Sequence, residues 1–438
     1  MRFFCQGFFT VKLVIALLLL SIAGAAQARV DYADEQNDWG VAMGLRSADI
    51  PFNSNEDTVN DVMPLLFYQG EHVYLDGLSG GVNLYQQDGF FAGLMGRFRF
   101  FDIDKDAQND IQGFSLDAGG VVGWQFDSGW QTQVEVLSDS DGRVHGNWLS
   151  KYHLTGDSWD FSPYAKLRFK SSRFNNRYYG LTLDDIGADY DITLGAKGRY
   201  QLYKNLYALG HVGITRLGRD TYHSDFINSP TQVETYIGLG LFNDPSHKYS
   251  GALANDAYVR LAHGWATPSN MGDIFKFNTE KDPYNNTMWS LFYGHPLADN
   301  LFDWPFDVYL TPGLIHHNKS DVQDRFMEYV VAIKAYYTFT WPVRWRLGAA
   351  EGLSYSSKIS YIEQSEMDRK DYKASKLLNY LDISLDVNIG DIVNQANLKG
   401  LWLGYSLHHR SGIFTSSSAF GRIKGGSNYN SLYLQWHF

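Results

Sequence analysis

Hydrophobic and polar side chains alternate one by one along many short segments of this chain, most clearly in two segments near its end. In LWLGYSLHHRS the odd positions from Leu401 to Leu407 share one side, and in SLYLQWHF the even positions from Leu432 to Phe438 do the same. Successive side chains of a β-strand point to opposite faces. The pattern therefore predicts two strands, each with one apolar face, that form a closing hairpin ending on an aromatic residue.

Similar segments of about ten residues recur along the chain, separated by clusters of Gly, Asp, Asn and Ser. The first series predicts about twelve strands, near residues 38–46, 62–69, 71–77, 80–87, 89–102, 115–126, 129–137, 145–154, 158–170, 189–200, 203–214 and 233–242. The second predicts about eight, near residues 253–265, 286–296, 304–316, 325–340, 344–356, 376–389, 400–411 and 428–438.

Strands with one apolar face and one mixed polar face are typical of outer-membrane barrels, which have lipid outside and polar groups inside. The fold class is therefore predicted as all-β, with antiparallel barrels of roughly 12 and 8 strands or one large barrel of about 20. Two barrels are favoured because both counts are even and because the first series also ends on an apolar-aromatic segment, GLGLF.

Composition supports a membrane barrel over a soluble enzyme. Aromatic residues reach 16% while charged residues fall to 19%, below the usual quarter. Tyr, Trp and Phe at strand ends form the aromatic girdles of such barrels. A soluble β-sandwich is the alternative, but it needs neither the terminal aromatic residue nor so many strands with an apolar outer face.

The first 28 residues read as a secretory signal peptide. They carry Arg2 and Lys12, then an apolar run, then the small-residue site Ala26-Gln27-Ala28. The sole cysteine, Cys5, lies within them, so we expect no disulfide in the mature chain. Cleavage would change the net charge from −11 to −13, which argues against a nucleic-acid partner. The predicted units are the signal peptide (1–28), a first half (29–243) and an eight-stranded second half (250–438).

Polar residues continue the lipid-facing side of the last two strands. His409 and Ser411 share the parity of Leu407, and Asn430 and Asn428 share that of Leu432. Polar groups are unfavourable at the centre of the bilayer and cost little near its surface, so these four should lie at the rim of the barrel.

Residues from about 38 to 242 resemble the MipA/OmpV outer-membrane proteins. The resemblance is carried by MPLLFYQGEHVYLDGLSGGVNLYQQDGFFAG (Met63 to Gly93), YYGLTLDDIGADYDITLGAKGRYQLYKNLYALGHVGITRL (Tyr178 to Leu217) and INSPTQ (Ile227 to Gln232). It implies an outer-membrane barrel, and some members of the family are scaffolds that link murein hydrolase and synthase.

The second half resembles the lipid A 3-O-deacylase family, known as PagL. Eight strands, with His409-Arg410-Ser411 on the seventh and an aromatic eighth, carry this resemblance. The family implies a hydrolase whose Ser, His and acid lie on the outer wall of the barrel. His409 and Ser411 match its base and nucleophile, while Asn428 or Asn430 stands where the family has Glu.

A serine is a weak nucleophile until a histidine takes its proton, and a third group must hold the histidine ring. Asn428, Asn430 and Asn379, on a neighbouring strand, are candidates for that group. Glu351 shares the lipid-facing parity of its own strand and is the candidate acid, although its strand is two away from that of His409, a distance of roughly 10 Å. A bulge could instead turn Glu351 inward.

Two functions follow from these patterns. The first is a structural or scaffold barrel for periplasmic murein enzymes, and the second is a lipid A esterase in the second half. The bland alternative for the His-x-Ser pattern is a set of interfacial polar residues. In either case the expected surroundings are outer-membrane lipid and lipopolysaccharide of a Gram-negative bacterium, and no metal or cofactor is expected.

Overall fold

The computed structural model describes residues 38–104, 114–243, 253, 255–276, 278–370, 374–412 and 426–438. The predicted signal peptide, residues 1–28, lies outside them. So does most of the segment that connects the last two strands.

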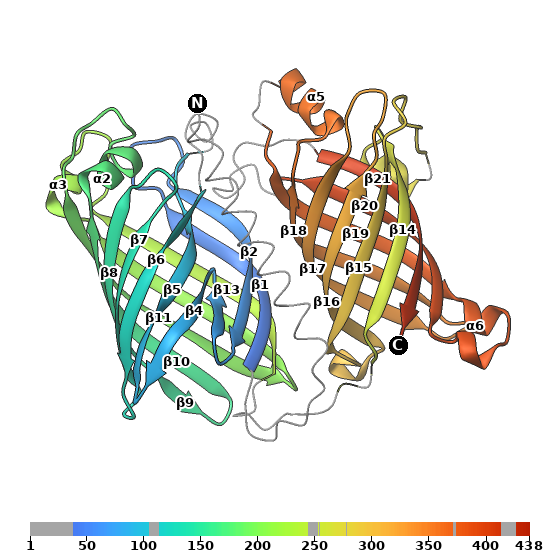
Figure 1. The fold of residues 1–438 in the computed structure, drawn as a ribbon, viewed down its shortest axis with the longest axis horizontal. Helices are drawn as coiled ribbons and strands as arrows, with labels where there is room; N and C mark the ends of the chain where they lie inside the picture. Colours follow the sequence, from blue (N-terminus) through green and yellow to red (C-terminus); the bar gives the residue numbers. More distant parts are fainter. Residues whose placement is uncertain are drawn as a thin grey trace.

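The first half forms a closed antiparallel barrel in which twelve strands follow one another around the wall (Figure 1). Its strands are β1 (Asp38–Asp49), β2 (Thr58–Gln69), β3 (Val73–Gly77), β4 (Ser79–Gln87), β5 (Phe90–Phe100), β6 (Phe114–Gln125), β7 (Trp130–Ser138), β8 (Val144–Tyr152), β10 (Trp159–Lys170), β11 (Asp189–Tyr203), β12 (Leu206–Arg216) and β13 (Thr231–Asn243). A thirteenth segment, β9 (Leu154–Gly156), pairs with β10 beyond the end of β8, and pairing of β1 with β13 closes the wall.

The second half forms a separate closed barrel of eight strands. These are β14 (Tyr258–Thr267), β15 (Thr287–Ala298), β16 (Phe306–His317), β17 (Phe326–Phe339), β18 (Trp345–Ser356), β19 (Leu377–Asn388), β20 (Leu401–Ser411) and β21 (Gly426–His437). Pairing of β14 with β21 closes this wall. Two tandem barrels, rather than one large barrel, are therefore present.

Short helices lie between the strands. They are α2 (Ser172–Tyr178), α3 (Arg219–Tyr222), α4 (Met271–Phe275), α5 (Tyr361–Lys370) and α6 (Ile389–Ile392), with 3-10 turns η1 (Leu301–Asp303) and η2 (Ala396–Leu398). Within the described ranges, the helices are too short and too polar to cross a membrane.

Each barrel has a turn end, where its first strand begins and its last strand finishes, and an opposite loop end. Trp39 pairs with Asn243 at the turn end of the first barrel, and Tyr258 with His437 at that of the second. Helices α2, α3 and α5 connect strands at the loop ends, and both loop ends face the same way in Figure 1. The two barrels therefore have the same orientation.

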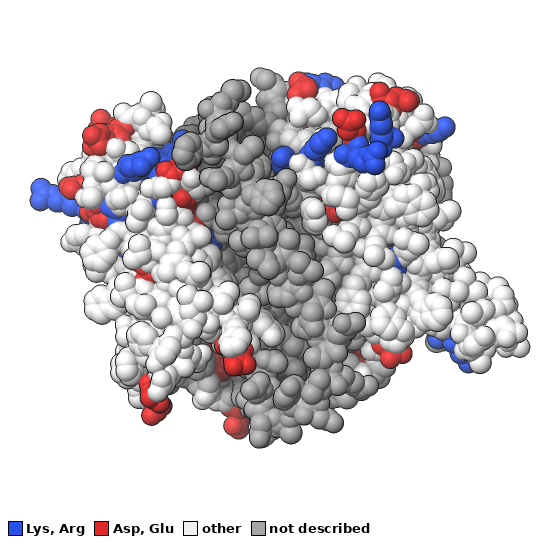
Figure 2. Space-filling model, in the orientation of Figure 1, with Lys and Arg blue, Asp and Glu red and all other residues white. Residues whose placement is uncertain are grey.

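Alternation of exposure confirms the predicted inward and outward faces. Leu403, Leu432 and Leu434 are about half exposed, whereas Tyr433 and Gln435 between them are buried. In Figure 2 the visible walls are mostly uncharged at mid-height, and Lys, Arg, Asp and Glu lie mainly towards the two ends. This is the surface that a hydrocarbon layer requires.

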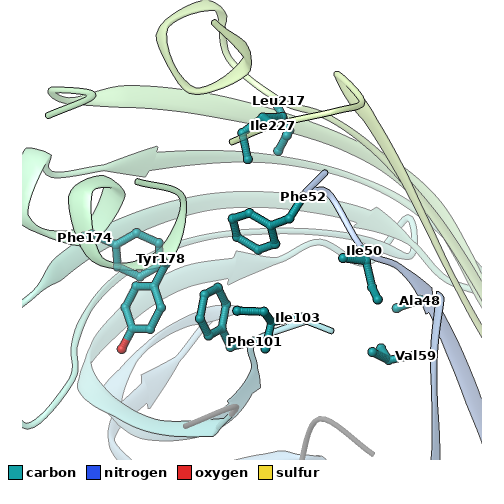
Figure 3. Packing of buried hydrophobic residues seen from close by; sticks show 10 residues of the cluster. All are labelled: Ala48, Ile50, Phe52, Val59, Phe101, Ile103, Phe174, Tyr178, Leu217 and Ile227. Carbon is teal, nitrogen blue, oxygen red and sulfur yellow. The ribbon is translucent and has the colours of Figure 1, made fainter. Parts of the chain in front are cut away.

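A buried apolar cluster, here called the plug, lies at the loop end of the first barrel (Figure 3). Side chains from the ends of β1 and β2 meet residues of the loops and of α2. Its members are Ala48, Ile50, Phe52, Val59, Phe101, Ile103, Phe174, Tyr178, Leu217 and Ile227. These side chains fill part of the loop end of the barrel, and separating them from their contacts costs free energy in proportion to the apolar area exposed.

The interior of the second barrel is filled by a different kind of packing. Asp382 accepts hydrogen bonds from both Arg260 and Lys334, and Arg346 Nε donates to Asp386 over 2.7 Å. Large buried tyrosines pack around these pairs: Tyr258, Tyr309, Tyr336, Tyr380, Tyr429 and Tyr433. An eight-stranded barrel has an interior just wide enough for side chains to fill, and here they do.

Contact between the barrels occurs at the turn end, and this contact is here called the joint. Its buried members are Val41, Leu206, Leu241, Leu297, Ala298, Leu301 and Val308. Asn205 Nδ2 donates to the carbonyl oxygen of Leu297 over 2.7 Å, and Tyr203 stacks on Phe302. Lys204 Nζ also lies 3.8 Å from Asp303 Oδ1 across the joint, which therefore combines apolar packing with polar contacts.

Candidate functional site

His409 lies on the outer wall of the second barrel, near the loop end of β20. It shares the parity of the exposed residues Leu403 and Tyr405 and is itself half-buried. Its neighbours His408 and Arg410 point into the interior and are 1% exposed. Strict alternation along β20 thus gives three consecutive polar residues two opposite environments.

Asn428 is the direct partner of His409. The two residues are opposite each other in the antiparallel pairing of β20 with β21, and His409 Nδ1 lies 2.5 Å from Asn428 Oδ1. The amide group of Asn428 is itself held, because its Nδ2 donates to the carbonyl oxygen of Ser269 over 2.8 Å. An amide oxygen can only accept, so this bond selects the tautomer with the proton on Nδ1 and leaves Nε2 as a free base.

Ser411 lies two residues beyond His409 on the same strand and is half-buried. No hydrogen bond connects these two described residues. Alternate residues of a strand are about 6.5–7 Å apart, so proton transfer between them needs a change of side-chain rotamer. Asn379 is opposite Ser411 in the neighbouring strand and is 4% exposed.

Asn430 does not contact His409. Its Oδ1 accepts a hydrogen bond of 2.5 Å from the hydroxyl of Tyr405. Of the two hairpin asparagines, the structure therefore brings Asn428 to the histidine and Asn430 to the tyrosine.

Glu351 faces outward, and the pairing of β18 with both neighbours is regular, without a bulge. It lies opposite Ile333 on one side and Leu381 on the other, so one whole strand separates it from His409. Ile333 packs against the joint, which places Glu351 towards the first barrel. Its Oε1 is buried without a hydrogen-bond partner, and it makes no contact with the His409–Asn428 pair.

A second cluster of polar side chains lies inside the barrel, directly behind this site. Glu328 Oε2 lies 2.7 Å from His317 Nε2, and Glu328 Oε1 lies 3.2 Å from His408 Nε2. Arg410 donates twice to Glu363, which comes from α5, over 2.7 and 2.8 Å. The β20 backbone separates this interior cluster from His409. Alternation indicates that these strand residues point inward, but no sequence signal names their partner in α5.

Metal binding finds no support in the described ranges, where no three His, Cys, Asp or Glu side chains are arranged to hold an ion. On the outer wall, the oriented His409–Asn428 pair is the arrangement that could act as a general base. A histidine whose ring is held by an acceptor can remove a proton from a hydroxyl group.

Comparison with known proteins finds a family match for the first barrel. Residues 40–241 match the family of the MltA-interacting protein MipA. The MipA match runs from β1 to β13, which confirms the resemblance predicted for residues 38–242, and it ends before the second barrel begins. No curated protein matches the chain.

Solved structures of outer-membrane barrels are similar to the chain at low identity. OccK11 of Pseudomonas aeruginosa is 10% identical over 91% of this chain and 95% of its own, with a TM-score of 0.23. OmpT of Vibrio cholerae is 7% identical over 94% of this chain and 100% of its own, with a TM-score of 0.21. These scores carry no argument about function, and the fold rests on the strand pairing itself.

The MipA match and the two closed barrels with apolar walls agree on location. The protein is an outer-membrane β-barrel protein of a Gram-negative bacterium, as predicted. In such barrels the short turns and the chain termini are periplasmic and the longer loops are extracellular.

Proposed function

We propose that the protein is a structural component of the outer membrane whose first barrel holds a periplasmic murein-processing enzyme. The proposal rests on the MipA match, which spans the first barrel from its first strand to its last. The family description names MltA as an interacting protein. The plug supports a structural role over solute transport, because it fills the loop end of the same barrel with buried apolar side chains.

A scaffold for a periplasmic enzyme must use its turn end. Asp157, in the turn between β9 and β10, is exposed there, and Asp220, in α3, is exposed at the loop end. They form a matched pair, because both are exposed aspartates of the same barrel on opposite sides of the membrane.

Site-specific photocrosslinking tests this proposal. A photoreactive amino acid at position 157 should crosslink in cells to a periplasmic murein hydrolase of the MltA kind, and the same amino acid at position 220 should not. The crosslinked partner is identified by mass spectrometry. Absence of any murein enzyme from adducts at position 157, in a host that expresses MltA, would contradict the scaffold.

A second candidate function, lipid A ester hydrolysis by the second barrel, is favoured by the His409–Asn428 pair. The pair faces outward near the loop end, and the longer loops of such barrels are extracellular, which supports access to outer-leaflet lipid. Asn428 orients the ring and leaves Nε2 as the base.

The reaction requires Ser411 to turn towards His409. Ser411 Oγ attacks the carbonyl carbon of the ester while His409 Nε2 takes the hydroxyl proton. The ester C–O bond breaks, the departing sugar hydroxyl takes that proton, and an acyl-serine remains. Water then attacks the acyl-serine with His409 again acting as base, and the fatty acid leaves.

Mass spectrometry of lipid A from cells that express each variant tests the second function. Ser411→Ala and His409→Ala should each abolish release of the fatty acid. Asn428→Ala should lower it without abolishing it, because the orienting group is the least costly member of such a triad to lose. Glu351→Gln should leave the product unchanged, since Glu351 makes no contact with the pair.

His263→Ala is the matched control. His263 also faces outward, on β14, where its ring packs on Trp289 at 4.6 Å between centroids. Its loss removes an outer-wall histidine without touching the pair. Lipid A that is identical in cells with and without the wild-type protein, in a host whose lipid A carries the ester, would eliminate the esterase and leave the scaffold.

A further inference from the structure

A cavity of about 300 Å³ lies inside the first barrel, directly beneath the plug. Phe101, Phe174 and Tyr178 belong to the plug and also line the cavity. The charged lining consists of five basic and three acidic residues: Arg46, Arg97, Arg99, Lys166, Arg168, Asp49, Asp102 and Glu234. The volume is at the lower end of the range for small-molecule sites.

Three of the five basic residues are neutralised by neighbours. Arg97 makes a two-pronged pair with Glu135 over 2.7 and 2.9 Å, and Arg99 does the same with Asp117 over 2.7 and 3.1 Å.

Arg46 is the third neutralised basic residue. It contacts the carboxylates of Asp61, Asp102 and Glu234, which come from three different parts of the chain. Three carboxylates share this one guanidinium, so they form an acidic side of the cavity with a surplus of negative charge.

Lys166 and Arg168 lie on β10 and differ from the other three. In the part of the chain that the structure describes, neither has a carboxylate within salt-bridge distance or a hydrogen-bond partner, and Arg168 Nε is buried. Asp191, opposite Arg168 in the next strand, accepts a bond of 2.7 Å from Lys170 instead. Both side chains are partly exposed, and two cations without an ion-pair partner on one wall of a cavity attract an anion.

We infer that Lys166 and Arg168 form a binding site for a small oxyanion, a carboxylate or a phosphate, inside the first barrel. Their side chains emerge from the same face of β10 at positions about 7 Å apart. One phosphate can bridge them, and a short dicarboxylate can place one group on each. Charge-assisted hydrogen bonds from Lys and Arg to such oxygens are the strong ones in proteins.

Isothermal titration calorimetry of the full-length protein in detergent, at low salt, tests the site. Inorganic phosphate and succinate are titrated separately, and the tighter of the two distinguishes the phosphate from the carboxylate source. Saturable binding of at least one is expected. Lys166→Gln and Arg168→Gln should each raise its Kd by about tenfold or more, because each removes charge-assisted hydrogen bonds. Lys166→Arg should stay within a few-fold of wild type.

Lys151→Gln is the matched control for the charge change. Lys151 also points into the first barrel, from β8, but does not line the cavity. Its loss should change the Kd by less than about threefold, since only the general positive field is reduced. If Lys151→Gln raised the Kd as much as Lys166→Gln does, the anion would be bound by the overall positive charge of the interior, and the proposed site would be wrong.

Thermal unfolding provides a measurement that does not depend on the variants folding. Succinate or phosphate should raise the unfolding midpoint of the wild-type protein, because a ligand of the folded state stabilises it, and uncharged succinamide should not. No saturable heat and no shift with either anion would overturn the proposal.

Discussion

The two barrels share a wall architecture but stabilise their interiors in opposite ways. The first is wider, keeps a cavity of about 300 Å³ and has the apolar plug at its loop end. The interior of the second is filled with buried ion pairs and tyrosines that reach up to α5. Interior width explains the difference: eight strands enclose about one layer of side chains, and twelve leave space that side chains do not fill.

This contrast predicts where each barrel is most sensitive to mutation. Loss of one charge should matter most where no water can replace it, in the second barrel. Loss of apolar volume should matter most in the plug, and loss of a hydroxyl should matter little beside the cavity. The four predictions below test these statements in order of expected effect.

The largest effect is expected for Glu363→Ala in α5. Arg410 and Glu363 are 1% and 4% exposed, so the substitution leaves Arg410 Nη1 buried without the carboxylate to which it donates, although Nε still donates to Ser354. Removing one partner of a buried pair typically costs about 3–5 kcal/mol. Limited proteolysis with mass spectrometry should show the second barrel opening at lower temperature than the first.

Glu366→Ala is its control on the same helix. Glu366 pairs with Arg369, which is 69% exposed, and an exposed pair contributes at most about 1 kcal/mol. Equal destabilisation by the two substitutions would mean that α5 is not anchored by the buried pair.

Ile50→Ala in the plug should destabilise the first barrel by about 2–3 kcal/mol, because it removes a 5% exposed side chain from a packed cluster. Ile237→Ala is the matched control, since Ile237 is 69% exposed on the outer wall of the same barrel. Urea unfolding in detergent measures both. A plug residue as tolerant as Ile237 would show that the loop end is not packed in solution.

A pair of Tyr→Phe substitutions compares the two interiors directly. Tyr336 is fully buried and donates to Gln435 over 2.9 Å, so Tyr336→Phe leaves a buried acceptor unpaired and should cost about 1–2 kcal/mol. Tyr164 makes a similar bond of 2.8 Å to His211 but lines the cavity. Water can replace its hydroxyl, so Tyr164→Phe should cost less than about 0.5 kcal/mol. The reverse order in urea unfolding would contradict a dry second barrel.

The smallest effect is expected at the turn end of the second barrel. Arg344 donates to both carboxylate oxygens of Asp391, over 2.7 and 2.9 Å, and holds the pKa of Asp391 below its usual value. A lowered pKa in the folded state means that the pair stabilises at neutral pH and that this contribution fades as pH falls through the carboxyl range. Asp391→Asn should therefore cost about 0.5 kcal/mol at pH 7, and less at pH 3. A pH-independent difference in unfolding midpoint would argue against the pair.

Strand positions could be predicted from the sequence because alternation is local information. The predicted strand 400–411 lies within one residue of β20, and 344–356 within one residue of β18. The start of β2 at Thr58 was missed by four residues, because the strand there projects beyond the apolar band and carries polar side chains on both faces. Apolar and polar residues alternate only along the part of a strand that faces lipid, so the pattern does not mark the strand ends beyond it.

Side-chain partners could be predicted only where the strand order already implied them. His409 and Asn428 are in adjacent strands of the final hairpin, so proximity was expected from the sequence. Arg46 and Glu234 are 188 residues apart and meet because β13 closes the first barrel on β1. Closure of a barrel is a global property, which no local pattern contains. The same reason hid the pairing of α5 with the interior of the second barrel.

The joint also determines how the molecule would respond to lateral forces. Its residues lie near the turn ends of their strands, so they meet within the depth of the periplasmic leaflet. Pressure in that leaflet compresses the contact, whereas pressure in the outer leaflet acts on the two walls at a distance from it, as on the arms of a lever. A change in the angle between the two barrel axes would therefore have to deform the packing around Asn205 and Leu297.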